Sequence, residues 1–337
     1  MSLFRPYFSV SPHTLSTDWN VFQKQHTATM LLKVKVLVFL LGVTSICMFW
    51  RAYMPMSHSV WASNQRVSEE DQWLMKHLTK SVEPFLAPNF NLEEDAFNWW
   101  KYLQNEKRSF STFKRTADEL FQMFPHTADV KGSGPKRRTT CAVVGNSGNL
   151  KKSQFGPLID FHDVIIRMNN GRTKGYEADV GSRTTHHVMY PESAMDLDNT
   201  THLVLLPFKI LDLEWVMKAL GTGFSGKSYM PIKSKIKANK DLVMVLNPAF
   251  VRYVHGIWLE KKGKYPSTGF VALVLALHIC DEVDVFGFGT DNDGNWSHYW
   301  EILRNKALKT GVHHGHNEYG VIQKLAQHHQ LRFYKRF

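Results

Sequence analysis

The sequence predicts an α/β, Rossmann-like fold with a mainly parallel sheet. Short apolar runs alternate with longer helical patterns along the chain, and of its 337 residues 43% are hydrophobic and 13% aromatic. The alternation is typical of a parallel sheet that helices cover on both faces. The composition allows a sizeable core and argues against a wholly disordered chain.

The predicted strands are short apolar runs that begin at Cys141, and helical patterns lie between them. The expected strands are Cys141–Val144, Val164–Met168, His187–Tyr190, His202–Pro207, Leu242–Leu246 and Val283–Phe286. The expected helices are one that begins at Asn91 and runs through Leu103, then Leu213–Leu220, Ala249–Lys262 and Thr268–Ile279. Gly263 suits the C-terminus of the third helix.

The N-terminal region contains an uncharged apolar segment, Val36 to Trp50, of fifteen residues. A helix of this length rises about 22 Å at ~1.5 Å per residue, which is short for a ~30 Å hydrocarbon core unless neighbouring residues contribute. We expect a transmembrane signal anchor at 36–50. A cleaved signal peptide is the alternative, but no small-x-small cleavage site follows Trp50.

Positive charges precede this segment at Lys24, Lys33 and Lys35, which predicts a cytosolic tail at 1–35 and a lumenal body. Residues 51–90 are mostly polar and contain several prolines, so we expect a stem there, with one helix around Glu69 to Lys80. The ordered domain of the chain is expected at 91–337.

The net charge of +11 favours anionic partners, such as membrane headgroups or a nucleotide and an acidic sugar. Nucleic acid is disfavoured because the basic residues are scattered, and the densest short run is Lys136-Arg137-Arg138. Most of these charges are expected to lie on a solvated surface.

Of the three cysteines, Cys47 lies in the apolar segment, which leaves Cys141 and Cys280 as the pair in the body. An oxidising lumen would allow them to form a disulfide, which we predict. Two free buried thiols are the alternative.

Two glycine-containing turns are candidates for binding an anion. The first, Val143 to Asn149, is a buried strand followed by a polar turn whose amides can approach a nucleotide phosphate. The second, Tyr265 to Gly269, precedes the helix 268–279, whose N-terminal N–H groups and dipole attract an anion. Each also has an ordinary structural interpretation, as a strand–helix turn and as a helix cap.

Histidines near the C-terminus, His298 and His313 above all, are candidates for proton transfer near neutral pH. A metal site is the alternative, because two further histidines follow His313 and the chain has two D-x-D pairs, at 196–198 and 291–293. Polar turns rich in Asp, Asn and Gly explain both pairs, so we expect no metal.

Together these segments resemble the motifs of the animal sialyltransferase family, in the family's order. The segments are Cys141 to Ser193 (the large motif), Tyr265 to Gly289 (small), His298–Glu301 (third) and His313–Glu318 (very small). The similarity covers roughly residues 91–337. Intervening segments such as Tyr190-Pro191-Glu192-Ser193 are most similar to β-galactoside α-2,3-sialyltransferases that act on Galβ1,3GalNAc.

The resemblance implies a single GT-A-type domain that transfers sialic acid from CMP-sialic acid to the 3-hydroxyl of a terminal β-galactose. The transfer would be inverting and metal-independent, with no cofactor, on glycoprotein or glycolipid acceptors. A single-pass type II protein of the Golgi membrane is implied. Two other functions stay open: a membrane-anchored, sugar-binding inactive homologue, and a metal-dependent glycosyltransferase.

The resemblance also implies a role for individual residues, each by its position in a motif. Donor-binding residues would be Asn146 and Asn169 (cytidine monophosphate), Ser147 and Tyr229 (phosphate and ribose), and Ser267, Thr268 and Gly269. His298 would stabilise the departing phosphate, and His313 would be the general base. Gln104 and Tyr265 would face the acceptor galactose.

We predict an N-glycan at Asn199, because Asn199-Thr200-Thr201 is a sequon in a polar turn. Asn295 also begins a sequon, but a glycan there would lie next to His298. Site-specific mass spectrometry of protein from mammalian cells should find Asn199 occupied. An occupied Asn295 with a bare Asn199 would refute this assignment.

Overall fold

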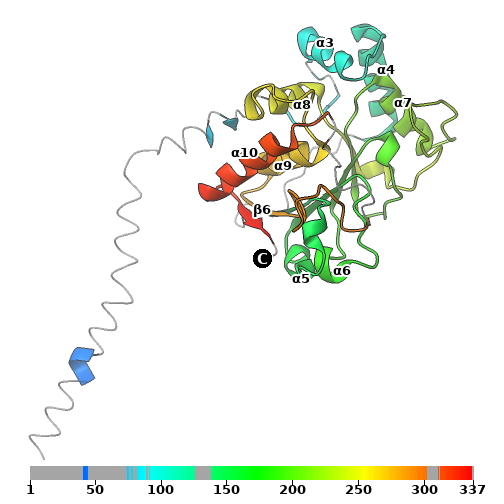
Figure 1. Ribbon diagram of the computed structural model, residues 1–337. Helices are drawn as coiled ribbons and strands as arrows, with labels where there is room; N and C mark the ends of the chain where they lie inside the picture. The colour runs from blue at the N-terminus through cyan, green and yellow to red at the C-terminus, as the bar shows by residue number, and fades with distance from the viewer. Residues whose placement is uncertain are drawn as a thin grey trace, which may run out of the picture. The chain divides into compact units, whose positions relative to one another are not determined.

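The structure is a computed structural model in which the described residues are 41–44, 74–75, 77–78, 82–88, 90, 92–125, 138–301, 310 and 312–335. Contacts divide the chain into two units, Met1–Ser68 and Glu69–Phe337. The second unit contains the α/β domain, whose ribbon is shown in Figure 1.

The predicted N-terminal segments lie largely outside the described residues. Of the anchor at 36–50, only residues 41–44 are described, and they are helical. No helix within the described ranges is both long and apolar enough to cross a membrane. The tail at 1–35, most of the stem at 51–90 and its predicted helix remain predictions.

The described residues form one seven-stranded sheet in the order β5-β4-β3-β2-β1-β6-β7. All the pairings between these strands are parallel. The strands are β1 (Thr140–Val144), β2 (Val164–Met168), β3 (His186–Met189), β4 (His202–Leu205), β5 (Val243–Val245), β6 (Glu282–Phe286) and β7 (Arg332–Tyr334). The predicted α/β class with a mainly parallel sheet is confirmed.

The register aligns the carboxyl ends of three central strands. Val144 at the end of β1 is paired with Arg167 of β2 on one side and with Phe286 of β6 on the other. The chain builds the sheet outward from β1 to β5 and then crosses back to place β6 beside β1. In α/β sheets, ligands bind at the carboxyl edge where the direction of winding reverses, which here lies between β1 and β6.

Helices surround the sheet, and most lie between successive strands in the chain. They are α3 (Glu94–Leu103), α4 (Phe110–Met123), α5 (Gly156–Asp160), α6 (Glu177–Val180), α7 (Ile210–Ala219), α8 (Pro248–Tyr253), α9 (Thr268–Ile279) and α10 (Gly315–Gln327). Figure 1 shows α5 and α6 on the opposite side of the domain from α8, α9 and α10.

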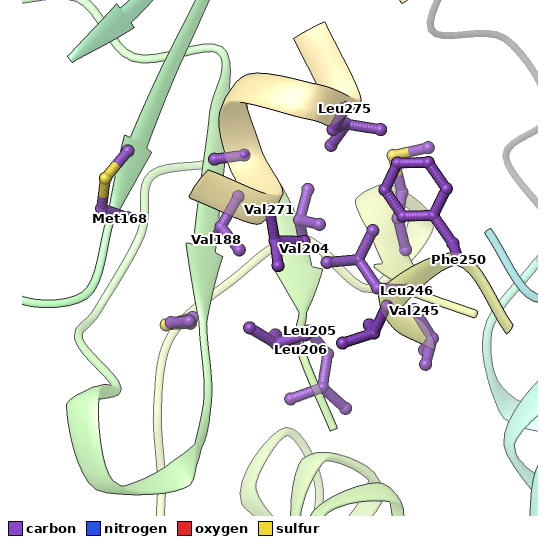
Figure 2. Close-up of a cluster of buried hydrophobic side chains, with 14 of the residues drawn as sticks. Met168, Val188, Val204, Leu205, Leu206, Val245, Leu246, Phe250, Val271 and Leu275 are labelled. Carbon is purple, nitrogen blue, oxygen red and sulfur yellow. The ribbon is translucent and has the colours of Figure 1, made fainter. Parts of the chain in front are cut away.

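Helix α9 forms the centre of the larger core cluster. It carries apolar residues on all sides, a pattern typical of a buried helix, and it contacts β1, β2, β3 and β6. Figure 2 shows Val271 of α9 next to Val188 of β3, and Leu275 further along the same helix. A smaller cluster, which includes Ile159 of α5, covers the other face. The sheet is therefore buried on both faces.

The predicted helix over 249–262 is wrong in its extent. α8 ends at Tyr253 and continues as a π-helical segment, Val254–Trp258. Glu260 and Lys261 then adopt positive φ angles of 50° and 61°, which an α-helix cannot contain. Gly263 also has a positive φ, of 80°, but it lies beyond the helix rather than at its end.

Strand β7 was not predicted, because it has only three residues and a tertiary contact holds it. Arg332 Nε donates to Asp284 Oδ1 of β6 at 2.6 Å, and His162 Nε2 lies 3.1 Å from Asp284 Oδ2. Burial alone would lower the pKa of His162, but the hydrogen bond to Asp284, the charge of that carboxylate and the backbone carbonyls of Leu158 and Ile159 together raise it. The buried carboxylate is thus paired with groups from two other segments.

Cys141 of β1 and Cys280 at the end of α9 are joined by a disulfide, the pair predicted from the sequence. Their Cα atoms are 6.0 Å apart, and the two residues are 139 positions apart in the chain. The bond therefore fastens the central strand to the helix that packs against it.

We predict that the variant with Cys141→Ser and Cys280→Ser loses up to about 5 kcal/mol of unfolding free energy, because an open chain regains the entropy of a long loop. Denaturant unfolding of the full-length variant and wild type measures the difference. Cys47→Ser is the matched control and should unfold like wild type. Equal stability of the double variant and wild type would contradict this account.

Candidate active site

A cavity of about 370 Å³ opens at the carboxyl edge of the sheet, beside the ends of β1, β2 and β6 and the N-terminus of α9. All the donor-binding, acceptor-binding and histidine residues predicted from the sequence line it. They are Gln104, Asn146, Ser147, Asn169, Tyr229, Tyr265, Ser267, Thr268, Gly269, His298 and His313. The structure thus brings together segments that are up to 209 positions apart in the chain, while each residue's role remains a prediction.

The turn after β1 forms one wall by close backbone contact with the turn after β6. Gly145 N–H donates to the Phe286 carbonyl at 2.8 Å, and Ser147 N–H donates to the Gly287 carbonyl at 3.0 Å. A Cβ atom on Gly145 would lie 2.3 Å from the Gly287 oxygen, so no side chain fits there. Glycine at 145 is therefore required for the two turns to approach.

Two asparagines lie side by side along the ends of β1 and β2. Asn146 Nδ2 donates to the Met168 carbonyl at 3.1 Å, while its buried Oδ1 has no partner among the described residues. Asn169 Oδ1 accepts from Ser193 Oγ at 3.1 Å, and its carbonyl accepts from His187 Nε2 at 2.7 Å. Both side chains are held by the protein, and Asn146 keeps an acceptor that a ligand amino group would satisfy.

The segment around His298 is paired with the β1 turn. Tyr299 N–H donates to the Asn146 carbonyl at 3.0 Å, and His298 forms an antiparallel bridge with Ser147. The His298 ring stacks on Trp300 with centroids 4.7 Å apart, and its Nδ1 lies 2.9 Å from Glu301 Oε2. These contacts orient a half-exposed imidazole at the cavity.

The N-terminus of α9 faces the cavity and is fixed by a buried carboxylate. Ser267 Oγ accepts from Phe270 N–H at 3.1 Å, and Ser267 donates N–H and Oγ–H to Glu318 of α10 at 2.7 and 2.5 Å. Burial raises the pKa of Glu318. The first helical N–H groups, of Thr268 and Gly269, have no intrahelical acceptor and are suited to an anion.

The ring of His313 is oriented by a backbone carbonyl. Its Nδ1 lies 3.0 Å from the Tyr265 oxygen, and the two rings meet edge to face at 4.9 Å. A carbonyl only accepts hydrogen bonds, so Nδ1 carries the proton in the neutral ring and Nε2 keeps its lone pair. The nearby carboxylate of Glu318 bonds Ser267.

Aromatic residues line the remaining wall. Tyr190 packs against Phe208, Phe208 against Tyr265, and Gln104 Nε2 lies 3.2 Å from the Tyr265 hydroxyl. Burial raises the pKa of Tyr190 to about 12, and it also raises the pKa values of Tyr229 and Tyr265. These hydroxyls therefore stay protonated at neutral pH and can donate hydrogen bonds to a ligand.

The D-x-D pairs are bound into local turns. Asp198 Oδ1 accepts from the N–H groups of Thr200 and Thr201 at 2.9 Å, and Asp291 Oδ2 accepts from Ser297 Oγ at 2.6 Å. Within the described ranges, no three His, Cys, Asp or Glu side chains gather as a metal-binding group. The predicted glycan acceptor Asn199 lies exposed in the first of these turns.

Sequence reasoning missed several residues of the cavity wall, among them Tyr190, Phe208, Phe288, Trp296 and Thr310. Most are aromatic, and an aromatic residue in an α/β domain is ordinarily expected in the core. The position of Phe288 two residues after β6 was the one available signal, since ligands bind beyond the carboxyl ends of such strands.

The fold and the site define an α/β domain whose cavity at the carboxyl edge of the sheet joins the N-terminus of α9 to His313. Residues 85–330 match the model of glycosyltransferase family 29 (sialyltransferase). The chain belongs to this family. The matched region begins slightly before the predicted domain boundary at 91.

Individual proteins support the same assignment. CMP-N-acetylneuraminate-beta-galactosamide-alpha-2,3-sialyltransferase 1 of Sus scrofa is 46% identical over 84% of this chain and 82% of its own. The Homo sapiens protein of that name is 44% identical over 78% of each chain. A mammalian sialyltransferase crystal structure matches with a TM-score of 0.74 at 46% identity, covering 81% of this chain and 96% of that chain. Another, in complex with Gal-beta-1-3GalNAc-ortho-nitrophenol, matches with a TM-score of 0.72 at 44% identity, covering 81% and 97%.

Proposed function

We propose that the chain transfers sialic acid from CMP-sialic acid to the 3-hydroxyl of a terminal β-galactose, with Galβ1,3GalNAc on glycoproteins or glycolipids as the acceptor. The observation that carries this proposal is one cavity lined both by the N-terminus of α9 and by His313, whose Nδ1 is bonded to the Tyr265 carbonyl. The names of the relatives and the disaccharide in the matched complex support this donor and this acceptor.

The donor is proposed to bind along the ends of β1 and β2. Asn146 Oδ1 would accept a hydrogen bond from the amino group of cytosine. This donor would satisfy the buried oxygen, which has no hydrogen-bond partner among the described residues. The phosphate would meet Ser147, the Tyr229 hydroxyl and the N–H groups of Thr268 and Gly269. The α9 dipole would stabilise its negative charge.

Transfer is proposed to be a direct displacement at the anomeric carbon. The galactose hydroxyl oxygen forms the new bond to that carbon as the bond to the phosphate oxygen breaks, and the hydroxyl proton passes to His313 Nε2. An alcohol is a weak nucleophile without a positioned base, and the Tyr265 carbonyl holds this imidazole in the accepting tautomer. The released phosphate takes the electron pair, and His298 and the helix N-terminus stabilise its charge.

Gln104 and Tyr265 are proposed to contact the acceptor galactose. Their side chains are already bonded to one another, and Tyr265 also carries the carbonyl that orients His313. Tyr265 would thus contact the sugar with its side chain and the proposed base, His313, with its carbonyl, so one residue would set the position of the sugar relative to the base. This arrangement would fix which galactose hydroxyl is deprotonated.

We also propose that residues 36–50 anchor the protein in the Golgi membrane with its body in the lumen. The lysines before this segment support that orientation, and a disulfide in the body suits an oxidising compartment.

The purified protein, labelled CMP-sialic acid and a panel of galactosides test the proposed reaction. We expect a 2,3-linked product with Galβ1,3GalNAc, formed equally well in the presence of a metal chelator. CMP and sugar binding without product would indicate an inactive homologue, and loss of turnover in chelator would indicate a metal-dependent enzyme.

We predict that His313→Ala lowers turnover by roughly 10²–10⁴-fold, the usual contribution of a general base, while CMP affinity stays near that of wild type. His298→Ala should instead weaken CMP binding as well as turnover, because that ring is proposed to contact the phosphate. Turnover numbers and calorimetric CMP titrations separate the two effects. Near wild-type turnover of His313→Ala across pH 5.5–7.5 would rule out the base.

A further inference from the structure

A largely buried polar cluster adjoins Tyr229 on the cavity wall. Its centre is Lys209 Nζ, which lies 3.1 Å from Glu192 Oε1, 3.5 Å from Asp212 Oδ1 and 3.0 Å from Ser228 Oγ. The side chains of Lys209, Glu192 and Asp212 are only 15%, 4% and 1% exposed. Charges so far from water have strong interactions and tolerate little rearrangement.

The cluster gathers three separate parts of the chain. Glu192 lies in the short helix after β3, Lys209 immediately precedes α7, and Ser228 lies in 221–239, where the structure has neither helix nor strand. Ser228 Oγ also bonds Glu192 Oε1. The Asp212 carboxylate is fixed in turn by the N–H groups of Phe208 and Lys209. A rigid anchor thereby holds a segment that has no regular structure of its own.

Tyr229 takes its position from this anchor. The Lys209 ammonium lies 5.1 Å from the centroid of the Tyr229 ring, within the range of a cation–π interaction. Tyr229 is 66% exposed, so burial in the core contributes little to fixing its ring. Its neighbour Ser228 is bonded to the same ammonium. Lys209 therefore contacts both the side chain of the residue before Tyr229 and the Tyr229 ring itself.

We propose that Lys209 is a positioning residue for the donor, which holds Tyr229 at the cavity so that its hydroxyl meets the donor phosphate. This inference rests on the proposed function of the cavity. Lys209 acts through Tyr229 and touches neither the donor nor the acceptor. Its loss should therefore raise the KM for CMP-sialic acid and the Kd for CMP, while the acceptor KM stays unchanged.

The test is a double-mutant cycle on the full-length protein with Lys209→Met, Tyr229→Leu and both together. Lys209→Met should weaken CMP binding roughly threefold to thirtyfold, the range of a cation–π contact. Tyr229→Leu should weaken it at least as much, because it removes the proposed phosphate contact, and the double variant should be no weaker than Tyr229→Leu alone. Lys218→Met, an exposed lysine on α7, is the matched control and should bind CMP like wild type.

Lys209→Met leaves two buried carboxylates without their cation, so it can fail to fold. The variant with Lys209→Gln, Glu192→Gln and Asp212→Asn removes the cation and both buried carboxylates while keeping neutral hydrogen-bonding groups in the cluster. It should unfold near the wild-type temperature and still bind CMP several-fold more weakly.

Two results would overturn the proposal. One is a folded Lys209 variant that binds CMP as tightly as the control Lys218→Met does. The other is that Lys209→Met weakens CMP binding by the same factor in the Tyr229→Leu background as in wild type, since Lys209 would then act by another route. Absence of CMP binding by the wild-type protein would instead refute the proposed function of the cavity. The wild-type titration therefore distinguishes failure of that function from failure of the role proposed for Lys209.

Discussion

The site depends on one constraint, the parallel placement of β1 between β2 and β6. This arrangement brings three strand ends to one edge of the sheet, and the turns that follow can then contact each other. Gly145 shows how close the contact is, because a single added carbon would lie against the Gly287 carbonyl. The asparagines, the His298 segment and Phe288 all take their positions from these turns. A shift of β6 would separate them.

Helix α9 transmits that constraint to the catalytic histidine proposed here. The helix is buried on all sides against the sheet, and the Cys141–Cys280 disulfide fastens its far end to β1. Its near end is tied through Ser267 to Glu318 of α10. His313 lies just before α10 and bonds the carbonyl of Tyr265, just before α9. The donor-binding helix terminus and the proposed base are therefore parts of one rigid assembly, as proximity catalysis requires.

The sequence predicts the features that depend on local pattern. Buried parallel strands read as apolar runs, which identifies β1 to β6, and the uniformly apolar α9 was located with its observed bounds. Features held by distant partners could not be found. Strand β7 depends on Arg332 meeting Asp284, and the pairing of Lys209 with Glu192 joins residues with no shared motif. The motifs identified the polar residues of the cavity, while its aromatic wall looked like ordinary core.

The central claim is that the Tyr265 carbonyl keeps His313 protonated on Nδ1, so that Nε2 is free to accept the acceptor's proton. Two-bond ¹H–¹⁵N correlation spectroscopy of ¹⁵N-histidine-labelled protein bound to CMP reads this tautomer directly, with His313→Ala to assign the signals. We expect the proton of the neutral tautomer on Nδ1, with Nε2 bare. A ring protonated on Nε2 alone would contradict the account, because no lone pair would then face the acceptor.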